Sequence, residues 1–368
     1  MNILMLNWRD VAHPQSGGAE LVTLEHARAW VKAGHAVTWF TAGFNRAAPE
    51  SHINGVRILR RGRWWSVYLH AAFYLLFYSK KFDVIVDQAH GIPFFSPLFT
   101  RKPVVVFIHE IAGDIWNVMF PFPVSALGRL LEKWYFRLYR HCFFWTIAPS
   151  TVEELVHRGI PRGQCVAIPN PLVVGTKGLI RDRPKEKVPT YIFVSRVVRM
   201  KGIEEVIKAF SFILRTQPKA KLWIIGGGEK RYMDELVEMM KEYGISQNVN
   251  VWGRVPEGKK FELMSRAHLL LHASVKEGWG LVVLEAAAVG TPSVVYNVSG
   301  LKDVVKNNIT GVVLADNSPD RMAAAAMKLT YDSARYRDFQ KNGKEWVNSL
   351  KWTTVTGESL RLLKKAMQ

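Results

Sequence analysis

The sequence predicts an α/β protein built from two doubly wound domains, each with a parallel sheet covered by helices on both faces. The chain has 368 residues, which is more than one ordinary domain holds. Hydrophobic residues make up 48% of it and charged residues 22%, the balance of a folded globular protein. Short apolar runs alternate with longer segments of helical period, as they do in doubly wound sheets.

Apolar runs rich in Val, Ile, Phe and Trp mark the expected strands. In the first half they are residues 3–8, 36–41, 56–59, 84–87, 104–108, 143–148 and 166–169. In the second half they are residues 191–195, 222–226, 249–252, 269–273, 293–296 and 311–314. Each half therefore predicts a sheet of its own.

The segment between the two halves, residues 174–189, is rich in Gly, Pro and charge and is the predicted linker. We expect a first domain over residues 1–180 and a second over residues 186–351. The last segment, residues 352–368, has apolar residues at helical spacing, and we expect it to cross back onto the first domain.

Cysteine usage and apolar segments bear on the compartment. Cys142 and Cys165 have no metal-ligand spacing between them, which favours a reducing compartment. The N-terminal apolar run lacks a basic lead and a small-residue cleavage site, so we expect a strand there and not a signal peptide. The longest apolar stretch, residues 64–79, is interrupted by His70 and is shorter than the roughly 20 residues that span a bilayer. A cytoplasmic protein without a transmembrane helix is expected.

The formal net charge of +19 predicts an anionic partner. Nucleic acid, anionic lipid and phosphorylated small molecules would all satisfy that charge. No zinc finger, RNA-recognition signature or basic zipper is present, and the 13 Trp are scattered instead of interleaved with Lys and Arg. We therefore do not expect nucleic acid as the partner.

The chemistry is concentrated in residues 272–296, which predict a strand, a glycine-bearing loop, a helix and a second strand. Glu277, Gly278 and Gly280 lie in the loop, the helix begins near Leu281, and Glu285 lies on its second turn. Glycines let backbone N–H groups approach a ligand beside the positive end of a helix dipole, where a diphosphate could bind. An ionised carboxylate in so apolar a helix needs a partner, which could be two ribose hydroxyls or a nearby Lys or Arg.

Two cations follow the first strand of the second half. Arg196 comes directly after the run 191–195, and Lys201 precedes Gly202 and a predicted helix. Open α/β sheets bind anions at the carboxyl ends of their strands, so this pair could hold a diphosphate. A solvated basic loop is the alternative.

Together these segments resemble the donor-binding domain of family 4 retaining glycosyltransferases of the GT-B fold. The resemblance is carried by SRVVRMKG followed by EGWGLVVLEAAAVGTPSVV, with seven residues between the two glutamates. Further matching positions occur in family order: SGGAE (residues 16–20), FIHE ending after His109, IAPST (147–151), IPN (168–170) and GGG (226–228). The resemblance covers nearly the whole chain and implies two Rossmann-like domains facing across a cleft.

The resemblance implies a role for each matching residue. Arg196 and Lys201 would hold the donor diphosphate, and Glu285 would bind the ribose hydroxyls. Glu277 with the amides of Gly278 to Leu281 would hold the donor sugar. The donor is expected to be a UDP or GDP sugar, and no other cofactor is implied.

In the first domain, Gly17 and Gly18 would bring the backbone against the phosphates, and His109 would lie near the transferred sugar or be satisfied locally. Trp279 stands where the family more often has Phe, which leaves the loop amides in place. Residues 299–303, SGLKD, depart from the family's double-glycine turn, so contacts to the base are open.

Metal independence is expected, because Arg196, Lys201 and a helix N-terminus can neutralise the departing diphosphate and no Asp-x-Asp metal signature is present. The family's retention is usually explained by same-face attack, in which the leaving phosphate takes the acceptor's proton. Glu277 as a covalent nucleophile is the alternative.

Basic and aromatic residues crowd the first domain. Arg57, Arg60, Arg61 and Arg63 precede Trp64 and Trp65, and Lys80 and Lys81 close the apolar stretch. Downstream, one helical face carries Arg129, Lys133, Arg137 and Arg140, and another carries Leu127, Leu130, Leu131, Trp134 and Leu138. Such a helix could rest on an anionic membrane or turn its apolar face to the core.

We expect a lipid-linked or other cell-envelope glycan acceptor and a peripheral position on the inner face of the cell membrane. A nucleotide-sugar 2-epimerase is the alternative among enzymes. A non-catalytic protein that keeps the fold and binds a polyanion or membrane is the alternative outside them.

Overall fold

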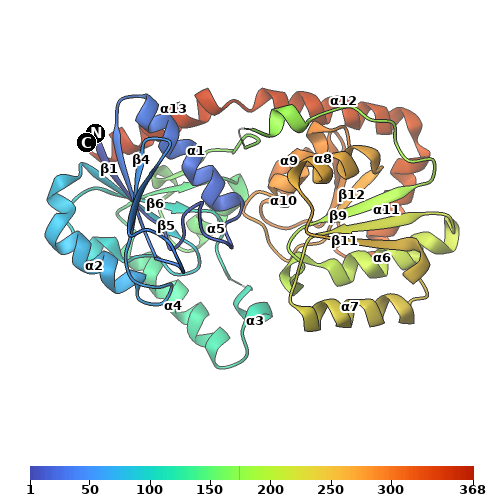
Figure 1. The fold of residues 1–368 in the computed structure, drawn as a ribbon, viewed down its shortest axis with the longest axis horizontal. Coiled ribbons are helices and arrows are strands. Elements are labelled where there is room, and N and C mark those ends of the chain that lie inside the picture. Colours follow the sequence, from blue (N-terminus) through green and yellow to red (C-terminus); the bar gives the residue numbers. More distant parts are fainter. Residues whose placement is uncertain (114, 174) are drawn as a thin grey trace. The chain divides into compact units, whose positions relative to one another are not determined.

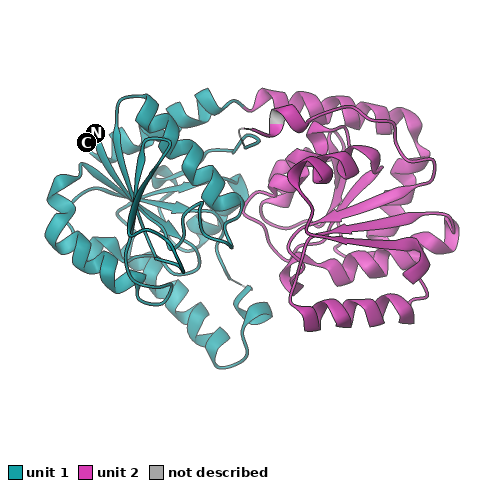
Figure 2. Cartoon of the chain, in the orientation of Figure 1, with its two compact units in different colours: residues 1–173, 351–368 teal, residues 174–350 magenta. Residues whose placement is uncertain are grey.

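The computed structural model describes residues 1–113, 115–173 and 175–368, and the chain divides into two compact units (Figures 1 and 2). Unit 1 comprises Met1–Val173 and Lys351–Gln368, and unit 2 comprises Val174–Leu350. Each unit contains a largely parallel sheet with helices on both faces, so the predicted α/β class with two doubly wound sheets is confirmed.

Within the described residues of unit 1, the sheet has eight strands in the order β3-β4-β2-β1-β5-β6-β7-β8. Their bounds are β1 (Asn2–Leu6), β2 (Ala36–Thr41), β3 (Glu50–Ile53), β4 (Val56–Arg60), β5 (Val84–Ala89), β6 (Val104–Ile108), β7 (Phe143–Thr146) and β8 (Cys165–Ala167). All pair in parallel except β3, which runs antiparallel to β4. β3 was not among the predicted strands, because its half-exposed sequence ESHI has no apolar run.

Helices cover both faces of this sheet (Figure 1). Their bounds are α1 (Gly18–Lys32), α2 (Val67–Tyr78), α3 (Ile115–Met119), α4 (Val124–Leu138), α5 (Pro149–His157) and α13 (Trp352–Ala366). Leu4 and Leu6 of β1 share a core cluster with residues of α2 and α4, while α1 and α13 pack on the other side. His26 and Trp30 of α1 both contact Ser359 Oγ of α13 at 3.1 Å, so the C-terminal helix is part of unit 1.

α4 turns its apolar stripe toward solvent. Gly128, Tyr135 and Phe136 face the core, whereas Leu127, Leu130, Leu131 and Trp134 are exposed. The ring of Trp116 in α3 packs over Gly128, where a Cβ atom would lie 2.4 Å from it. The alternative in which this stripe faces the core is therefore wrong for these four side chains, whereas Leu138 is half-buried and packs on the core. The helix also ends at Leu138, so Arg140, predicted on its basic face, lies beyond it.

Within the described residues of unit 2, a six-stranded sheet runs in the order β11-β10-β9-β12-β13-β14, with every pair parallel. The strands are β9 (Thr190–Val194), β10 (Lys221–Ile225), β11 (Val249–Gly253), β12 (Leu269–His272), β13 (Ser293–Val295) and β14 (Gly311–Val313). The helices are α6 (Ile203–Thr216), α7 (Lys230–Glu242), α8 (Glu257–Arg266), α9 (Leu281–Ala288), α10 (Leu301–Val304), α11 (Pro319–Tyr331) and α12 (Ser333–Ser349). The predicted strands of this half are confirmed to within one residue at each end.

The strand order of unit 2 reverses between β9 and β12. The chain leaves β9 toward β10 on one side, and β12 continues toward β13 on the other. Loops that leave neighbouring strands in opposite directions open a crevice at the carboxyl edge, where doubly wound sheets bind ligands. The two loops of interest, residues 195–202 and 273–280, both begin at this point.

The predicted linker, residues 174–189, falls within unit 2, and residues near its end contact the rest of that unit. Lys185 Nζ donates to Ala267 O and to Thr291 Oγ1, each at 2.8 Å, and burial lowers the pKa of Lys185 to about 7. Glu186 forms an ion pair with Arg266. The end of this segment is thus anchored on the body of unit 2 to which it belongs.

None of the helices in the described part of the chain combines the length and the apolar character needed to cross a bilayer.

Candidate functional site

The loops after β9 and β12 lie directly against each other. Val275 N–H donates to Met200 O at 2.9 Å. Gly202, at φ +68°, closes the short 3₁₀ turn Arg199–Lys201, and a Cβ atom there would lie 1.9 Å from Ala273 O. Only glycine allows so close an approach at a left-handed position. This contact places Lys201 beside the loop that carries Glu277.

One carboxylate oxygen of Glu277 has three partners. Its Oε1 lies 2.6 Å from Lys201 Nζ, 2.9 Å from His272 Nε2 and 2.9 Å from Ser274 Oγ. The Lys201 and Glu277 side chains are 12% and 13% exposed, so this cluster is shielded from water. Burial favours the neutral acid, but Lys201 and His272 outweigh it and hold the pKa of Glu277 well below its ordinary value. Glu277 is therefore an ionised carboxylate at neutral pH.

The segment after β13 supports the same loop. Glu277 N–H donates to Ser299 O at 3.2 Å. Gly300 has φ +83°, and a Cβ atom on it would lie 2.2 Å from Glu277 O. The glycine of the sequence SGLKD thus allows the backbone of Glu277 to lie against it, where any side chain would clash.

The N-terminus of α9 follows immediately. Gly280 adopts the left-handed conformation that starts the helix at Leu281, as predicted, and no side chain of the described residues caps it. The N–H groups of a helix's first turn have no intrahelical acceptor and carry the positive end of the helix dipole. Trp279 is buried, so this turn presents mainly backbone. The turn is suited to an anion such as a phosphate.

Arg196 lies at the carboxyl end of β9 with its side chain exposed. The backbone around it packs on the glycine turn 226–228: Val197 N–H donates to Gly227 O at 2.9 Å. A Cβ atom on Gly226 would lie 1.7 Å from Ser195 O, and one on Gly228 would lie 2.3 Å from Val197 O. Gly226 and Gly228 therefore have a packing role beneath Arg196, whereas a Cβ atom on Gly227 would meet only the Arg254 side chain.

Glu285, on the second turn of α9, forms an ion pair with Lys260 of α8, with Oε2 and Nζ 2.8 Å apart. Lys260 also pairs with Glu257 at 2.8 Å. Burial raises the pKa of Glu285, and the charge of Lys260 opposes that rise. Lys260 is thus the partner of this carboxylate in the structure, and ribose binding at Glu285 stays a prediction.

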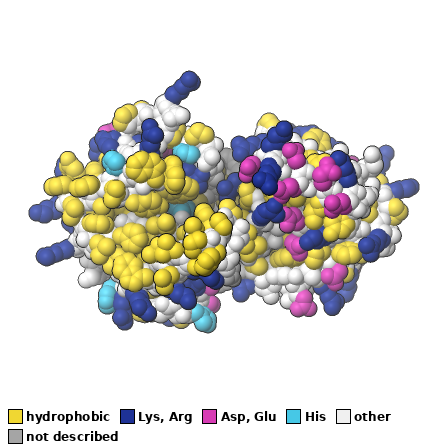
Figure 3. Space-filling model, turned by 90° about the horizontal axis from the view of Figure 1, so that it is seen from below, with side chains coloured by type: hydrophobic (Ala, Val, Ile, Leu, Met, Phe, Trp, Pro, Cys, Tyr) yellow, Lys and Arg dark blue, Asp and Glu magenta, His cyan; other side chains and the backbone are white. Residues whose placement is uncertain are grey.

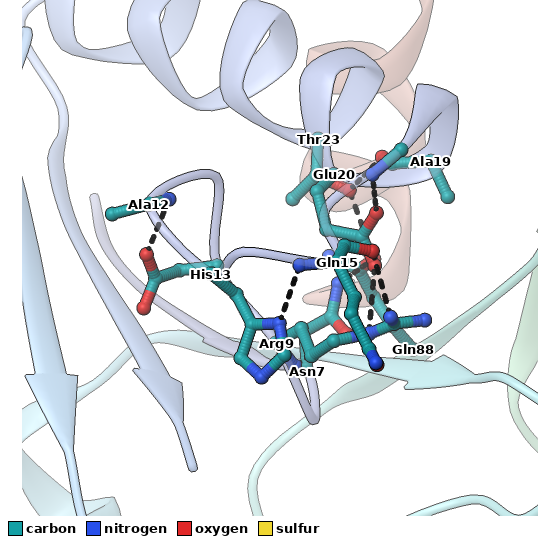
Figure 4. Close-up of polar contacts among 11 residues, drawn as sticks. Asn7, Arg9, Ala12, His13, Gln15, Ala19, Glu20, Thr23 and Gln88 are labelled. Atoms are coloured by element: carbon teal, nitrogen blue, oxygen red, sulfur yellow. Dashed lines mark hydrogen bonds and ion pairs between the residues drawn. The ribbon is translucent and has the colours of Figure 1, made fainter. Parts of the chain in front are cut away.

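In unit 1, the loop between β1 and α1 is held by its own polar contacts (Figure 4). Gly17 N–H donates to Glu20 Oε2 at 2.7 Å, and Arg9 donates to Gln15 O at 2.8 Å. Asn7 Nδ2 donates to Gln88 Oε1 at 2.9 Å. The Gly17 amide is thus bonded to Glu20, while Gly18 is the first residue of α1. A phosphate at Gly17 would have to replace the Glu20 carboxylate.

His109 is buried at the end of β6. Its ring centroid lies 4.2 Å from that of Phe107 and 5.0 Å from that of His90. Burial, and then the neighbouring His90 and His26, lower the pKa of His109, so the ring is neutral at pH 7. Among the described residues, neither His109 Nε2 nor His90 Nε2 has a hydrogen-bond partner.

The structure brings Lys201, Glu277 and the α9 N-terminus together in unit 2, with Arg196 at the next strand end. His109, Gly17 and Gly18 belong to unit 1.

Sequence reasoning missed His272, Ser274, Lys260, Gly300 and His90. His272 and Ser274 could have been found from the sequence, because they are the two polar residues at the end of the apolar run LLLHAS. Nothing in the sequence around Lys260 indicates that it pairs with Glu285. In the described part of the chain, no group of three or more His, Cys, Asp or Glu side chains is arranged to hold a metal ion.

Two family models match this chain and together cover most of it. Residues 16–174 match the model described as Glycosyltransferase Family 4, and residues 179–346 match Glycosyl transferases group 1. An uncharacterized glycosyltransferase of Methanocaldococcus jannaschii is 26% identical, with 100% of this chain and 99% of that protein covered. A GDP-mannose-dependent α-(1-6)-phosphatidylinositol monomannoside mannosyltransferase of Mycobacterium tuberculosis is 30% identical over 46% of each chain.

Solved structures share the fold. A sucrose-phosphate synthase from Thermosynechococcus elongatus superposes with a TM-score of 0.80 at 20% identity, covering 99% of this chain and 98% of that one. Anabaena HepE, in complex with UDP and glucose, superposes with a TM-score of 0.76 at 16% identity, covering 99% and 100%.

Proposed function

Because the chain belongs to the family 4 glycosyltransferases and has the GT-B fold, we propose that it moves a sugar from a nucleoside diphosphate sugar to a hydroxyl acceptor, with retention of configuration and without a metal ion. One observation carries this proposal. Lys201, Glu277 and the N-terminus of α9, which no side chain of the described residues caps, lie together where the strand order of the unit 2 sheet reverses between β9 and β12. A cation and backbone amides suit a diphosphate, and an ionised carboxylate suits sugar hydroxyls.

Breaking the glycosyl phosphate bond places negative charge on the departing diphosphate. Lys201, the exposed Arg196 and the α9 amides provide positive potential on the side where that charge develops. Lys201 is paired with Glu277, so donor binding would share Lys201 between the carboxylate and the phosphate. Glu277, positioned by His272 and Ser274, would accept hydrogen bonds from the donor sugar.

Retention would follow from attack on the face that the diphosphate leaves, with a phosphate oxygen taking the acceptor's proton. The low pKa of Glu277 suits a hydrogen-bond acceptor for the sugar, and also suits a nucleophile. A glycosyl-enzyme trapped at Glu277 would contradict same-face transfer.

The donor base is tested by thermal stabilisation, because a ligand that binds only the folded form raises its melting temperature. HepE binds UDP and the mycobacterial relative is named for GDP-mannose, so both nucleotides should be compared. At about a hundred times its Kd, the right nucleotide stabilises the fold by about 2.7 kcal/mol. The shift should vanish in Lys201→Gln and persist in Lys219→Gln, an exposed lysine elsewhere in unit 2.

Turnover is tested with a panel of nucleotide sugars and purified protein. Nucleoside diphosphate released only when an acceptor is present indicates transfer. Glu277→Gln should retain nucleotide binding and lose turnover. Isomerisation of the donor sugar without an acceptor would instead indicate a 2-epimerase.

For the acceptor, we propose a lipid-linked glycan or phospholipid reached by a cytoplasmic enzyme resting on the inner face of the membrane. The net charge of +19 favours an anionic surface. The mycobacterial relative is named for a phosphatidylinositol monomannoside acceptor, which supports a lipid-borne substrate.

A further inference from the structure

Unit 1 exposes large apolar side chains on two helices of the same face. On α2 and just before it, Trp64, Leu69, Phe73 and Phe77 are 69%, 63%, 63% and 73% exposed. On and just before α4, the exposed side chains are Phe122, Val124, Leu127, Leu130, Leu131 and Trp134. Figure 3 shows hydrophobic side chains gathered over the unit 1 part of this view. A soluble monomer rarely leaves so much apolar surface uncovered without a binding role.

The two helices form one docking face because they pack on one core. Val67, Ala71 and Leu75 of α2 and Tyr135 and Phe136 of α4 belong to the same buried cluster beneath the sheet. One side of each helix is therefore buried in this core, and the opposite side, which is also apolar, is exposed to solvent. We refer to the outer sides of α2 and α4, with Trp64 and Trp65, as the α2/α4 face.

The exposed charges on α2, on α4 and in the residues directly flanking them are positive, and the first acid after α2 is the exposed Asp83. Beside α2 they are Arg61, Arg63, Lys80 and Lys81, and on or after α4 they are Arg129, Lys133, Arg137 and Arg140, all exposed. The sequence from Arg61 to Phe82 has no Asp or Glu. The single acid of α4, Glu132, is 3% exposed, and its Oε2 accepts from Gly113 N–H at 2.9 Å.

We infer that the α2/α4 face docks on an anionic lipid bilayer, with its Trp, Phe and Leu side chains entering the interface and its Arg and Lys side chains meeting lipid phosphates. This rests on the proposed function, for which it identifies the surface that brings the enzyme to a lipid-borne acceptor. Interfacial helices combine such an apolar side with a cationic margin, and long Lys and Arg side chains can reach head groups while their stems stay on apolar surface.

The charge pattern favours lipid over a second copy of the chain. A two-fold dimer through this face would bring two cationic margins together with no exposed acid on either helix to offset them. An anionic bilayer offers the opposite charge along the whole margin and an apolar interior between. Self-association is therefore an outcome that would count against the proposal.

The test is flotation of the full chain with vesicles of phosphatidylcholine alone or mixed with phosphatidylglycerol, without donor or acceptor. We expect binding to the mixed vesicles that weakens with salt. Phe73→Gln/Phe77→Gln and Leu127→Gln/Leu130→Gln should each weaken binding at least about tenfold, because exposed apolar area that would be buried is removed. Arg129→Gln/Lys133→Gln should weaken binding to the mixed vesicles roughly thirtyfold.

Matched controls remove the same kinds of side chain from unit 2. Val237→Gln/Tyr331→Gln and Lys219→Gln/Lys328→Gln change exposed residues and should bind as the wild type does. Every substituted residue is exposed, so melting temperatures should stay within a few degrees. Binding that is equal in all variants, or a dimer that the α2 and α4 variants dissociate while vesicle binding is unchanged, overturns the proposal. Nucleotide stabilisation is measured without vesicles, so failure of the donor proposal is seen separately.

Discussion

Three polar side chains of the site contact the same atom, Oε1 of Glu277. Lys201 supplies the charge, while His272 and Ser274 come from the end of β12 and orient the carboxylate. His272 is fully buried, and its ring lies 6.0 Å from that of Phe193, so it is enclosed by the core of unit 2. His272 is accordingly a positioning residue for a carboxylate that would touch the sugar.

Replacing His272 tests that positioning role. His272→Ala should lower kcat/KM for the donor about tenfold to a hundredfold, the cost of losing a hydrogen bond to a charged group. His272→Gln, whose amide can reach the Nε2 position, should recover part of the loss. Steady-state kinetics with separate KM and kcat, alongside melting temperatures, provide the measurement. Activity of His272→Ala within twofold of wild type would remove this role.

The low pKa of Glu277 predicts a pH-dependent contribution to stability. A carboxylate whose pKa is lower in the folded state stabilises the fold above its ordinary pKa of 4.5 and loses that contribution as pH falls below it. Glu277→Gln should therefore lower the free energy of unfolding of unit 2 by about 3 kcal/mol at pH 7, with a smaller difference below pH 4.5.

Calorimetry across this pH range checks the prediction. The control is Glu238→Gln, which breaks an exposed pair with Lys241 and should cost at most about 1 kcal/mol. A difference for Glu277→Gln that stays constant from pH 7 to strongly acid pH would show that the Glu277 carboxylate is not stabilised by its partners.

At the scale of elements, glycines decide how closely the loops of unit 2 approach. The loop after β12 lies between Gly202 on one side and Gly300 on the other, and both have a left-handed backbone against a carbonyl of that loop. The position of Glu277 is therefore set by two turns that are far from it in sequence. Helix α9 can then begin at Leu281 with no side chain of the described residues capping it.

Gly300 and Gly244 form a matched pair for testing this packing. Both have positive φ, +83° and +66°, but a Cβ atom on Gly300 would lie 2.2 Å from Glu277 O, whereas nothing lies within 4 Å at Gly244. Gly244→Ala should cost only the backbone strain, about 1–2 kcal/mol, and leave donor turnover unchanged. Gly300→Ala should destabilise more and also lower kcat/KM. Equal effects on turnover would show that Gly300 does not position Glu277.

At the scale of the whole molecule, unit 1 is completed by a helix from the far end of the chain. Val355, Leu362 and Leu363 of α13 are buried, and Ser359 contacts His26 and Trp30. Each buried aliphatic side chain contributes about 1.5–3 kcal/mol. The last helix is therefore a structural part of the first half.

Ending the chain at Leu350 should destabilise unit 1 by several kcal/mol and leave unit 2 largely intact, because α13 packs on α1, β6 and β7. Two-transition calorimetry, or proteolysis followed by mass spectrometry, would detect loss of the unit 1 transition alone. A truncated chain that melts as the intact protein does would contradict this assignment.

Individual residues and elements show which features could be predicted from the sequence and which could not. Among the residues that the structure describes, the apolar runs predicted every strand except β3, and Gly280 marked the start of α9 at Leu281. The spacing of the Leu and Trp residues predicted an apolar stripe on α4, but it did not show whether the stripe faces the core or the solvent. Lys260, which pairs with Glu285, gave no signal, because the two residues lie on different helices.

The sequence by itself determined the alternation of strands and helices, the glycine turns and the spacing of the charged residues, since hydrophobic period and backbone conformation depend on neighbouring residues. Only the tertiary structure decided that His272 and Ser274 share Glu277 with Lys201, that Glu285 faces Lys260, and that the apolar side of α4 is turned to solvent. Those outcomes depend on which distant segments are brought into contact, and a linear pattern does not contain that information.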